Sequence, residues 1–202
     1  DYKQAIASFR SFLDAAPLVP AFHDQVFRDG SRHRVIVNIG GIANVSSLKP
    51  GQPFAGFDCG PGNVLMDAWA RRHRGVDFDE GGRWASEGRR DEALLARLVS
   101  EPYFAAPPPK STGRELFGED WLSARLGKGI APADVQATLL ELTAASIVQA
   151  IDRFCGRADE IYLCGAGARN GRLAARIAEL ASPRPVLPTD ALGVPTGHVE
   201  AM

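Results

Sequence analysis

The residues best suited to chemistry gather in three glycine-rich segments, each expected to follow a strand. The first contains Asn38, Gly40 and Gly41, between two predicted strands. Glycine lets a backbone approach a phosphate closely, and the amides of the turn can point at it. These three residues are therefore candidates for binding phosphate. A plain hairpin turn is the alternative, because hairpins favour glycine for their own reasons.

The second segment runs from Asp58 to Asn63 and places a carboxylate at a strand end, directly before a predicted helix. The N-terminus of a helix attracts anions. Asp58 could hold a magnesium ion, directly or through water, because Mg²⁺ prefers oxygen ligands and retains several waters. The alternative is a helix-capping turn in which Asn63 is the N-cap.

The third segment, around Gly165 and Gly167, again joins a buried strand to a helix. Its small residues would leave room for a flat base or a ribose. A dinucleotide-binding GxGxxG fingerprint needs a third glycine in phase. Ala168 and Asn170 flank the position where that glycine would fall, so we do not predict a dinucleotide site.

A charged loop, P-K-S-T-G-R, ends at Arg114 and resembles a phosphate-binding loop only superficially. A Walker A motif needs glycine directly before the lysine and another five residues earlier. Pro109 and Phe104 stand at those positions, so this motif is rejected. Lys110 and Arg114 remain candidate site cations, and a solvated charged loop is the alternative.

Bulk composition excludes several classes of function. The chain has 202 residues, a formal net charge of -1 and 45% hydrophobic residues. Such a chain has no bulk electrostatic attraction for nucleic acid or an anionic membrane. No apolar run reaches the ~20 residues of a membrane span, and no signal segment opens the chain. Three sparse cysteines suggest no disulfide framework, so we expect a reducing, cytoplasmic location.

Five strands are predicted to carry these segments. β-Branched and apolar runs bounded by glycine and proline turns favour strands. They lie at residues 34–38, 42–48, 54–58, 161–164 and 185–187. The first three follow one another through short turns, so we expect them to form a β-meander.

Helices are expected to follow the meander. Apolar residues at helical spacing predict a helix from Val64, a short one at 91–99, a long one from Pro132 to about Phe154, and one at 172–180. Residues 75–90 are glycine-rich and charged, and we expect a loop there. A meander followed by alternating helices and strands is the ribonuclease-H-like topology, the repeated half of actin-like kinases. We therefore predict an α/β protein with a mixed sheet.

The two ends of the chain are expected to belong to a longer protein. The chain starts without a methionine and ends at Met202 inside an expected helix start. Residues 1–20 are weakly patterned, and the prolines near Pro20 favour an extended segment. A short helix could follow at residues 21–28.

Six phrases occur together and in order: A-P-L-V-P-A-F-H, V-N-I-G-G-I-A-N-V-S, F-D-C-G-P-G-N-V-L-M-D-A-W, P-Y-F-A-A-P-P-P-K-S-T-G-R-E, D-V-Q-A-T-L-L-E-L-T-A and Y-L-C-G-A-G-A-R-N. In this combination the chain resembles the anhydro-N-acetylmuramic acid kinases, from about Ala16 to Met202. The resemblance implies a kinase that opens the 1,6-anhydro ring with water and phosphorylates O6 with ATP, giving N-acetylmuramic acid 6-phosphate and ADP. It also implies Mg²⁺, a homodimer and a part in recycling peptidoglycan in the cytoplasm.

The resemblance further implies a role for each candidate residue. The turn with Asn38, Gly40 and Gly41 is similar to the second phosphate loop of the fold, which grips the ATP phosphates. The other implied roles are lining the cleft near metal and sugar (Asp58, Gly60, Gly62, Asn63), binding adenosine (Gly165, Gly167, Ala168), a candidate substrate loop (Lys110, Ser111, Thr112, Arg114) and a glutamate near the attacking water (Glu200).

Two parts of the family pattern are absent or altered. The first phosphate loop, Gly-Thr-Ser-x-Asp-Gly, is absent. The family's general base is an aspartate in a stretch resembling Asp-Val-Ala-Ala-Gly-Gly-Gln-Gly-Ala-Pro-Leu-Val-Pro, and here the Gly-Gly-Gln-Gly is missing. Asp14 is the candidate base, and a plain linker carboxylate is the alternative.

The absence of the first phosphate loop determines the domain organisation that we expect. We assign residues 1–24 to a connector from a missing N-terminal lobe, and residues 25–202 to a C-terminal, ribonuclease-H-like nucleotide-binding lobe. On this assignment the chain alone is expected to be inactive. The alternatives are a truncated, non-catalytic remnant of the kinase, and another actin-fold phosphotransferase such as an acetate kinase or a polyphosphatase. The P-P-P-K-S-T-G-R-E phrase disfavours the last.

Overall fold

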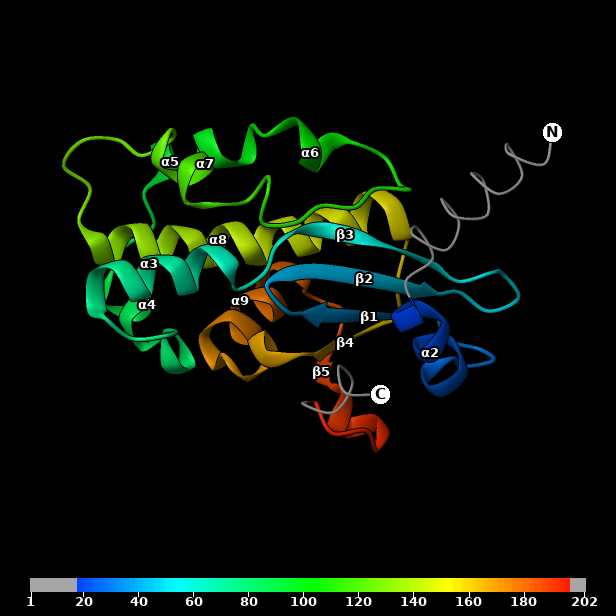
Figure 1. The fold of residues 1–202 in the computed structure, drawn as a ribbon. Helices are drawn as coiled ribbons and strands as arrows, with labels where there is room; N and C mark the ends of the chain where they lie inside the picture. Colours follow the sequence, from blue (N-terminus) through cyan, green and yellow to red (C-terminus); the bar gives the residue numbers. More distant parts are fainter. Residues whose placement is uncertain (1–17, 197–202) are drawn as a thin grey trace.

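The computed structural model describes residues 18–196, and a mixed sheet of five strands lies at its centre (Figure 1). In chain order the strands are β1 (Arg34–Ile39), β2 (Ile42–Leu48), β3 (Ala55–Pro61), β4 (Glu160–Cys164) and β5 (Val186–Pro188). The spatial order is β3-β2-β1-β4-β5. The first three strands form an antiparallel meander, whereas β4 pairs in parallel with β1 and β5 in parallel with β4. The predicted α/β class, meander and mixed sheet are confirmed.

The two strands in the middle of the sheet are buried on both faces. All five residues of β1 after Arg34 are buried, and so is every residue of β4. A strand that is covered on both faces needs apolar residues on both, so its sequence is a nearly continuous apolar run. This is the physical reason why residues 34–38 and 161–164 predict strands.

Helices cover one face of the sheet. The long helix α8 (Pro132–Ala150) packs along β2 and β3 and against α3 (Val64–Arg74) and α9 (Gly171–Ala181). Most of its side chains are buried, because small and apolar residues occupy nearly all of its sides. A π-helical turn, η2 (Ile151–Cys155), continues it, and Gly156 follows with a φ of 74°. The predicted end of the long helix before this glycine is confirmed.

The chain between α3 and α8 forms short helices: η1 (Glu80–Gly82), α4 (Arg83–Glu87), α5 (Glu92–Val99), α6 (Pro102–Ala105) and α7 (Glu119–Ser123). The helix predicted at 91–99 is confirmed as α5, with the Asp91 carboxylate accepting a bond from Leu94 N at 2.7 Å. The loop predicted at 75–90 is wrong in part, because η1 and α4 lie within it. Burial of Trp84 and Ala85 stabilises α4, and five residues are too few for a helical period to be recognised.

Fewer elements cover the opposite face of the sheet. Helix α2 (Leu18–Phe27) packs there against β1 and β2, and the turn η4 (Thr189–Leu192) lies beside β4. A second, smaller group of buried residues fills the space: Phe27, Ile36, Leu48, Tyr162 and Cys164.

Helix α2 begins earlier than the sequence predicts. It starts at Leu18, so the extended segment predicted through Pro20 is wrong for residues 18–20. Pro20 lies in the first turn of this helix. The first four N–H groups of a helix have no partner within it, so a proline is tolerated there.

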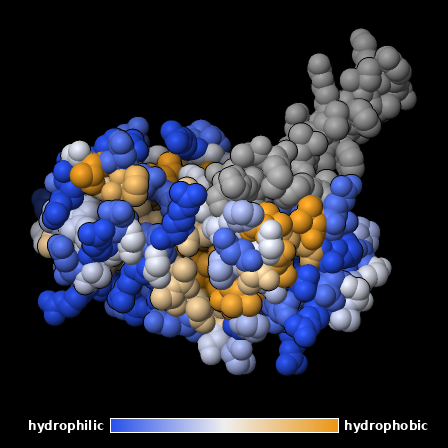
Figure 2. Space-filling view, turned by 90° about the horizontal axis from the view of Figure 1, so that it is seen from below, coloured by the Kyte–Doolittle hydropathy of each residue, from blue (hydrophilic) through white to orange (hydrophobic). Residues whose placement is uncertain are grey.

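Figure 2 shows the molecule from below Figure 1, where hydrophobic residues gather in the middle and polar residues surround them. Two large hydrophobic side chains, Val26 of α2 and Leu187 of β5, are 44% and 40% exposed. Counting only residues 18–196, the α2 and β5 side of the sheet is therefore less completely covered than the helical face. Within residues 18–196, no helix has the length and apolar character needed to cross a membrane.

Candidate functional site

The three glycine-rich segments meet at one edge of the sheet. They follow β1, β3 and β4, which run in the same direction, so their carboxyl ends lie at the same edge. In sheets of this kind, ligands bind outside the carboxyl ends of parallel strands. The topology therefore brings together residues that lie more than a hundred positions apart in the sequence.

The β1–β2 turn and the loop before α3 touch backbone to backbone. Gly62 N donates to Gly41 O at 2.9 Å, and Asn63 N donates to Gly40 O at 2.8 Å. A Cβ added to Gly62 would lie 2.2 Å from Gly40 O. These two amides are thus used within the fold. Asn63 occupies the N-cap position of α3, but its side chain makes no capping bond, so the capping alternative is wrong.

The loop after β4 packs just as closely on the end of β1. Gly165 has a φ of 82°, and a Cβ there would lie 2.2 Å from Asn38 Oδ1. A Cβ on Gly167, within the turn η3 (Ala166–Arg169), would lie 2.3 Å from Ile39 Cγ2 and 2.8 Å from Asn63 Oδ1. All three glycine-rich segments are therefore in direct contact.

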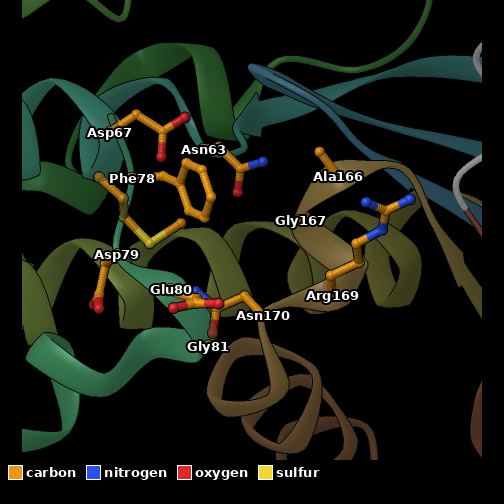
Figure 3. A pocket seen from close by; sticks show the side chains of 11 residues that line it. Asn63, Asp67, Phe78, Asp79, Glu80, Gly81, Ala166, Gly167, Arg169 and Asn170 are labelled. Atoms are coloured by element: carbon orange, nitrogen blue, oxygen red, sulfur yellow. The ribbon is translucent and has the colours of Figure 1, made fainter. Parts of the chain in front are cut away.

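Next to these loops lies a cavity of about 440 Å³ (Figure 3). In Figure 3 the side chains of Asn63, Asp67 and Phe78 lie across from Ala166 and Arg169. The complete lining is Asn63, Met66, Asp67, Phe78, Asp79, Glu80, Gly81, Ala166, Gly167, Arg169 and Asn170. The predicted adenosine-loop residue Gly167 thus forms part of a cavity wall, and Ala168 packs partly buried against the core.

A second cavity, of about 380 Å³, shares Asn63, Asp67 and Ala166 with the first. Gly40 and Gly41 of the β1–β2 turn line it. It is also lined by two cations, Arg71 of α3 and Arg114 of the predicted substrate loop. The lining also includes the carboxylates of Asp67 and Glu119, so an anion bound here would rely on the guanidinium groups of Arg71 and Arg114.

Asp67 is the carboxylate common to both cavities, and sequence reasoning missed it. Burial raises its pKa from 3.8 to about 6, although Arg71 and Arg114 act in the opposite direction. Asn63, Asp67 and Arg71 are spaced four residues apart and so share one side of α3. This spacing, within a helix that follows a glycine-rich turn, is the signal that could have found them.

Asp58 lies apart from the two cavities, in a polar row across the less covered face of the sheet. Asn38 pairs with Asn44 across β1 and β2, and Asn44 with Asp58 across β2 and β3, so the three side chains point to the same face. Among the residues that the structure describes, Asn38 Oδ1 and Asn44 Oδ1 are buried without a hydrogen-bond partner. The row therefore offers oxygen atoms that the described fold leaves unused.

The loop predicted to bind substrate holds the Asp58 carboxylate. Asp58 Oδ2 accepts bonds from Ser111 Oγ at 3.1 Å and from Thr112 N at 3.0 Å. Burial raises the pKa of Asp58, and these two bonds and the nearby Lys110 lower it. The structure thus brings together Asp58, Ser111 and Thr112 of the predicted site.

Lys110 turns away from both cavities, among aromatic rings. Its Nζ lies 4.6 Å from the ring centre of Tyr103, 5.2 Å from that of Phe154 and 6.0 Å from that of Phe57. It also donates to Tyr103 O at 3.1 Å. The contacts of Lys110 are therefore those of an anchor for the loop.

The remaining predicted site residues lie elsewhere. Gly60 has a φ of 155° and packs against Phe104, whose Cε1 lies 2.6 Å from the position of an added Cβ, and it lines neither cavity. Asp14 and Glu200 lie outside the described residues 18–196. In that range, no three His, Cys, Asp or Glu residues are grouped as a metal site. All three cysteines are buried, and burial raises the pKa of Cys155 to about 12, which disfavours a nucleophilic thiolate.

Comparison with known sequences gives one family. Residues 13–202 match the family described as anhydro-N-acetylmuramic acid kinase. The chain is 54% identical over 186 residues to the protein of that name from Nitrosospira multiformis, covering 92% of this chain and 51% of that protein. It is 49% identical over 205 residues to the protein of the same name from Chromobacterium violaceum, covering 98% and 56%. The chain spans about half the length of the curated relatives it matches.

Comparison with solved structures gives the fold. The activator of the 2-hydroxyisocaproyl-CoA dehydratase from Clostridium difficile, with bound ADPNP, matches 93% of this chain and 66% of its own at a TM-score of 0.52 and 17% identity. The ligand-bound xylulose kinase from Lactobacillus acidophilus matches 91% and 43% at a TM-score of 0.50 and 12% identity. At these identities the likeness concerns the fold, which is that of the actin-like ATPases.

Proposed function

The chain belongs to the anhydro-N-acetylmuramic acid kinase family, and from that premise we propose that it is the nucleotide-binding lobe of such a kinase. In the complete enzyme, water opens the 1,6-anhydro ring, and ATP phosphorylates O6 to give N-acetylmuramic acid 6-phosphate and ADP. The observation that carries the proposal is the meeting of three glycine-rich loops beside two cavities that share lining residues. The family match argues against an acetate kinase or a polyphosphatase.

The two cavities suit different parts of ATP, the second its phosphates and the first its adenosine. The second cavity combines the β1–β2 turn with Arg71 and Arg114, and these groups suit the phosphates. The wall of the first cavity includes the apolar side chains of Met66 and Phe78 and the small residue Gly167, and these suit the adenosine. Asn63, which borders both, would lie near the junction of ribose and phosphates.

The polar row fits a hydrated magnesium ion. Mg²⁺ usually takes one or two carboxylates, several waters and phosphate oxygens. Asp58 would supply the carboxylate, and the unused amide oxygens of Asn38 and Asn44 lie beside it in the row. A bound Mg²⁺ would neutralise charge on the transferred phosphoryl group. Ser111 and Thr112 keep the Asp58 carboxylate in place through their hydrogen bonds.

The remaining chemistry needs a base for water and a second lobe. Phosphoryl transfer depends mainly on positioning and on electrostatic stabilisation of the transition state. Asp14 is the proposed base, and Glu200 is proposed to position the attacking water. We assign residues 1–24 to the connector from the other lobe and residues 25–202 to the nucleotide-binding lobe. The assembled enzyme is proposed to be a cytoplasmic homodimer.

One experiment tests the proposal. The 202-residue chain, alone and joined to the N-terminal lobe of the Nitrosospira multiformis relative, is incubated with ATP, Mg²⁺ and labelled anhydro-N-acetylmuramic acid. We expect the labelled 6-phosphate only from the two-lobe protein, and binding of ADP by both proteins. Binding of ADP by the chain, with a folded but inactive two-lobe protein, would support a non-catalytic remnant. Failure of both folded proteins to bind ADP would overturn the proposal.

A further inference from the structure

Phe78 is an exposed aromatic side chain on the wall of the first cavity. Its side chain is 59% exposed, the largest exposed fraction among the large hydrophobic residues that the structure describes. Figure 3 shows its ring between the side chains of Asp67 and Asn63, across the cavity from Ala166 and Arg169. A ligand that covers an apolar ring exposed at a cavity wall gains free energy by removing the ring from water.

The backbone next to Phe78 is held firmly. Both oxygens of the Asp79 carboxylate accept backbone bonds, from Trp84 N at 2.8 Å and from Ala85 N at 2.9 Å. At the other end of the turn, Gly82 is so close to α9 that an added Cβ would lie 2.6 Å from Arg172 Cβ. The ring of Phe78 is therefore presented from an anchored segment, which lowers the entropy lost when a ligand binds.

The opposite wall includes two residues with little or no side chain beside Arg169. Ala166 and Gly167 have small side chains or none, and a Cβ on Gly167 is prevented by Ile39 and Asn63. A space between an aromatic ring and a wall that combines the small Ala166 and Gly167 with Arg169 suits a nucleobase, with one face of the base stacked on the ring.

We propose that Phe78 is the stacking platform for the purine base of the bound nucleotide. The proposal rests on the proposed function, because the nucleotide is the one assigned to these cavities. Stacking requires only a π-face, which every base has, so Phe78 contributes to affinity for both ADP and GDP. It contributes nothing to the binding of the phosphates, which lie in the second cavity.

The test is calorimetric titration of the 202-residue chain with ADP, GDP and inorganic pyrophosphate, all with Mg²⁺. Phe78→Ala is expected to weaken ADP and GDP binding about tenfold or more, and to leave pyrophosphate binding unchanged. Phe78→Trp should restore the affinity for both nucleotides. The matched control is Val76→Ala, since Val76 is exposed in the same segment but lines neither cavity.

Each outcome decides one claim. Nucleotide affinities of a folded Phe78→Ala chain equal to those of the unchanged chain would overturn the stacking role while leaving the proposed function intact. An equal loss for pyrophosphate would also overturn it, since the substitution would then act through the shape of the whole site. Failure of the unchanged chain to bind either nucleotide is the different result that contradicts the proposed function itself.

Discussion

Two regions of the molecule carry the predicted site residues, and they are built by opposite means. At the sheet edge, the loops with Gly62, Gly165 and Gly167 meet because side chains are absent. Around Asp58, the loop with Lys110 and Ser111 is held by side chains, through aromatic rings and hydrogen bonds. In the first region, a side-chain atom added to one of these glycines should strongly lower the free energy of unfolding. In the second region, the free energy of unfolding should fall gradually as contacts are removed.

The two regions also differ in the groups that surround their buried carboxylate. Burial raises the pKa of both Asp58 and Asp67. Asp58 receives hydrogen bonds from the substrate loop, which partly offset its burial. Asp67 has guanidinium groups nearby, and its pKa still rises to about 6. Hydrogen bonds thus oppose the effect of burial at Asp58, whereas at Asp67 only nearby positive charges do so, and burial still raises the pKa of both groups.

The largest effect is expected at Gly165. Gly165→Ala adds a Cβ that overlaps Asn38 Oδ1 at a residue with positive φ. Overpacking and the strain of a backbone conformation that essentially only glycine adopts should together lower the free energy of unfolding by about 2–6 kcal/mol. Urea denaturation of the 202-residue chain measures this loss. Gly156→Ala has similar backbone strain but open space, so it should cost only about 1–3 kcal/mol. Equal losses would show that the close packing contributes nothing.

Asp58→Asn tests the second region through function. In the two-lobe protein we expect kcat to fall about 100-fold or more, because the metal and phosphate site loses its carboxylate. In the chain alone, Mg²⁺ should no longer strengthen ADP binding. The control Asp120→Asn removes an exposed carboxylate from α7 and should change neither quantity. A normal rate and a normal Mg²⁺ effect in Asp58→Asn would disprove the role of Asp58.

Lys110→Met tests whether the loss of one set of contacts in the second region lowers the free energy of unfolding only moderately. Removal of the ammonium from among three rings should lower the free energy of unfolding by about 1–2 kcal/mol, as measured by urea denaturation. Lys110→Arg should keep most of the stability, since a guanidinium also interacts with aromatic faces. Lys128→Met changes an exposed lysine and should have almost no effect. If Lys110→Met matched that control, the aromatic contacts would carry no stability.

The smallest effect concerns Asp67 and pH. Its pKa rises on folding, so between about pH 4 and pH 6 the folded state binds more protons than the unfolded state. The free energy of unfolding should therefore fall as the pH rises through this window. Asp67→Asn should remove this fall in the free energy of unfolding between about pH 4 and pH 6. It should also stabilise the chain at pH 7 by about 1 kcal/mol, once solvent screening is allowed for. Glu87→Gln, at an exposed site, should leave the profile unchanged, and an unaltered profile in Asp67→Asn would contradict the buried carboxylate.

Local patterns were enough for the longer elements. The apolar runs in β1 and β4 and the spacing of residues in α8 predict their elements, because burial on two faces demands apolar residues almost everywhere. The short helix α4 could not be predicted in this way. It depends on Asp79 accepting bonds from its first amides and on burial of Trp84, and both conditions arise only in the folded chain.

By itself, the sequence determined the fold class, the family and the three glycine-rich segments, because these depend on local composition and on phrases in order. Only the tertiary structure decided which residues meet. The parallel alignment of β1 and β4 brings Ile39 against Gly165 and Gly167, the packing of α3 brings Asp67 between the two cavities, and an anchored turn presents Phe78. The tertiary structure likewise places Lys110 against its aromatic rings. Such contacts join residues distant in the chain, and no local pattern records them, since their free energy comes from packing that exists only after folding.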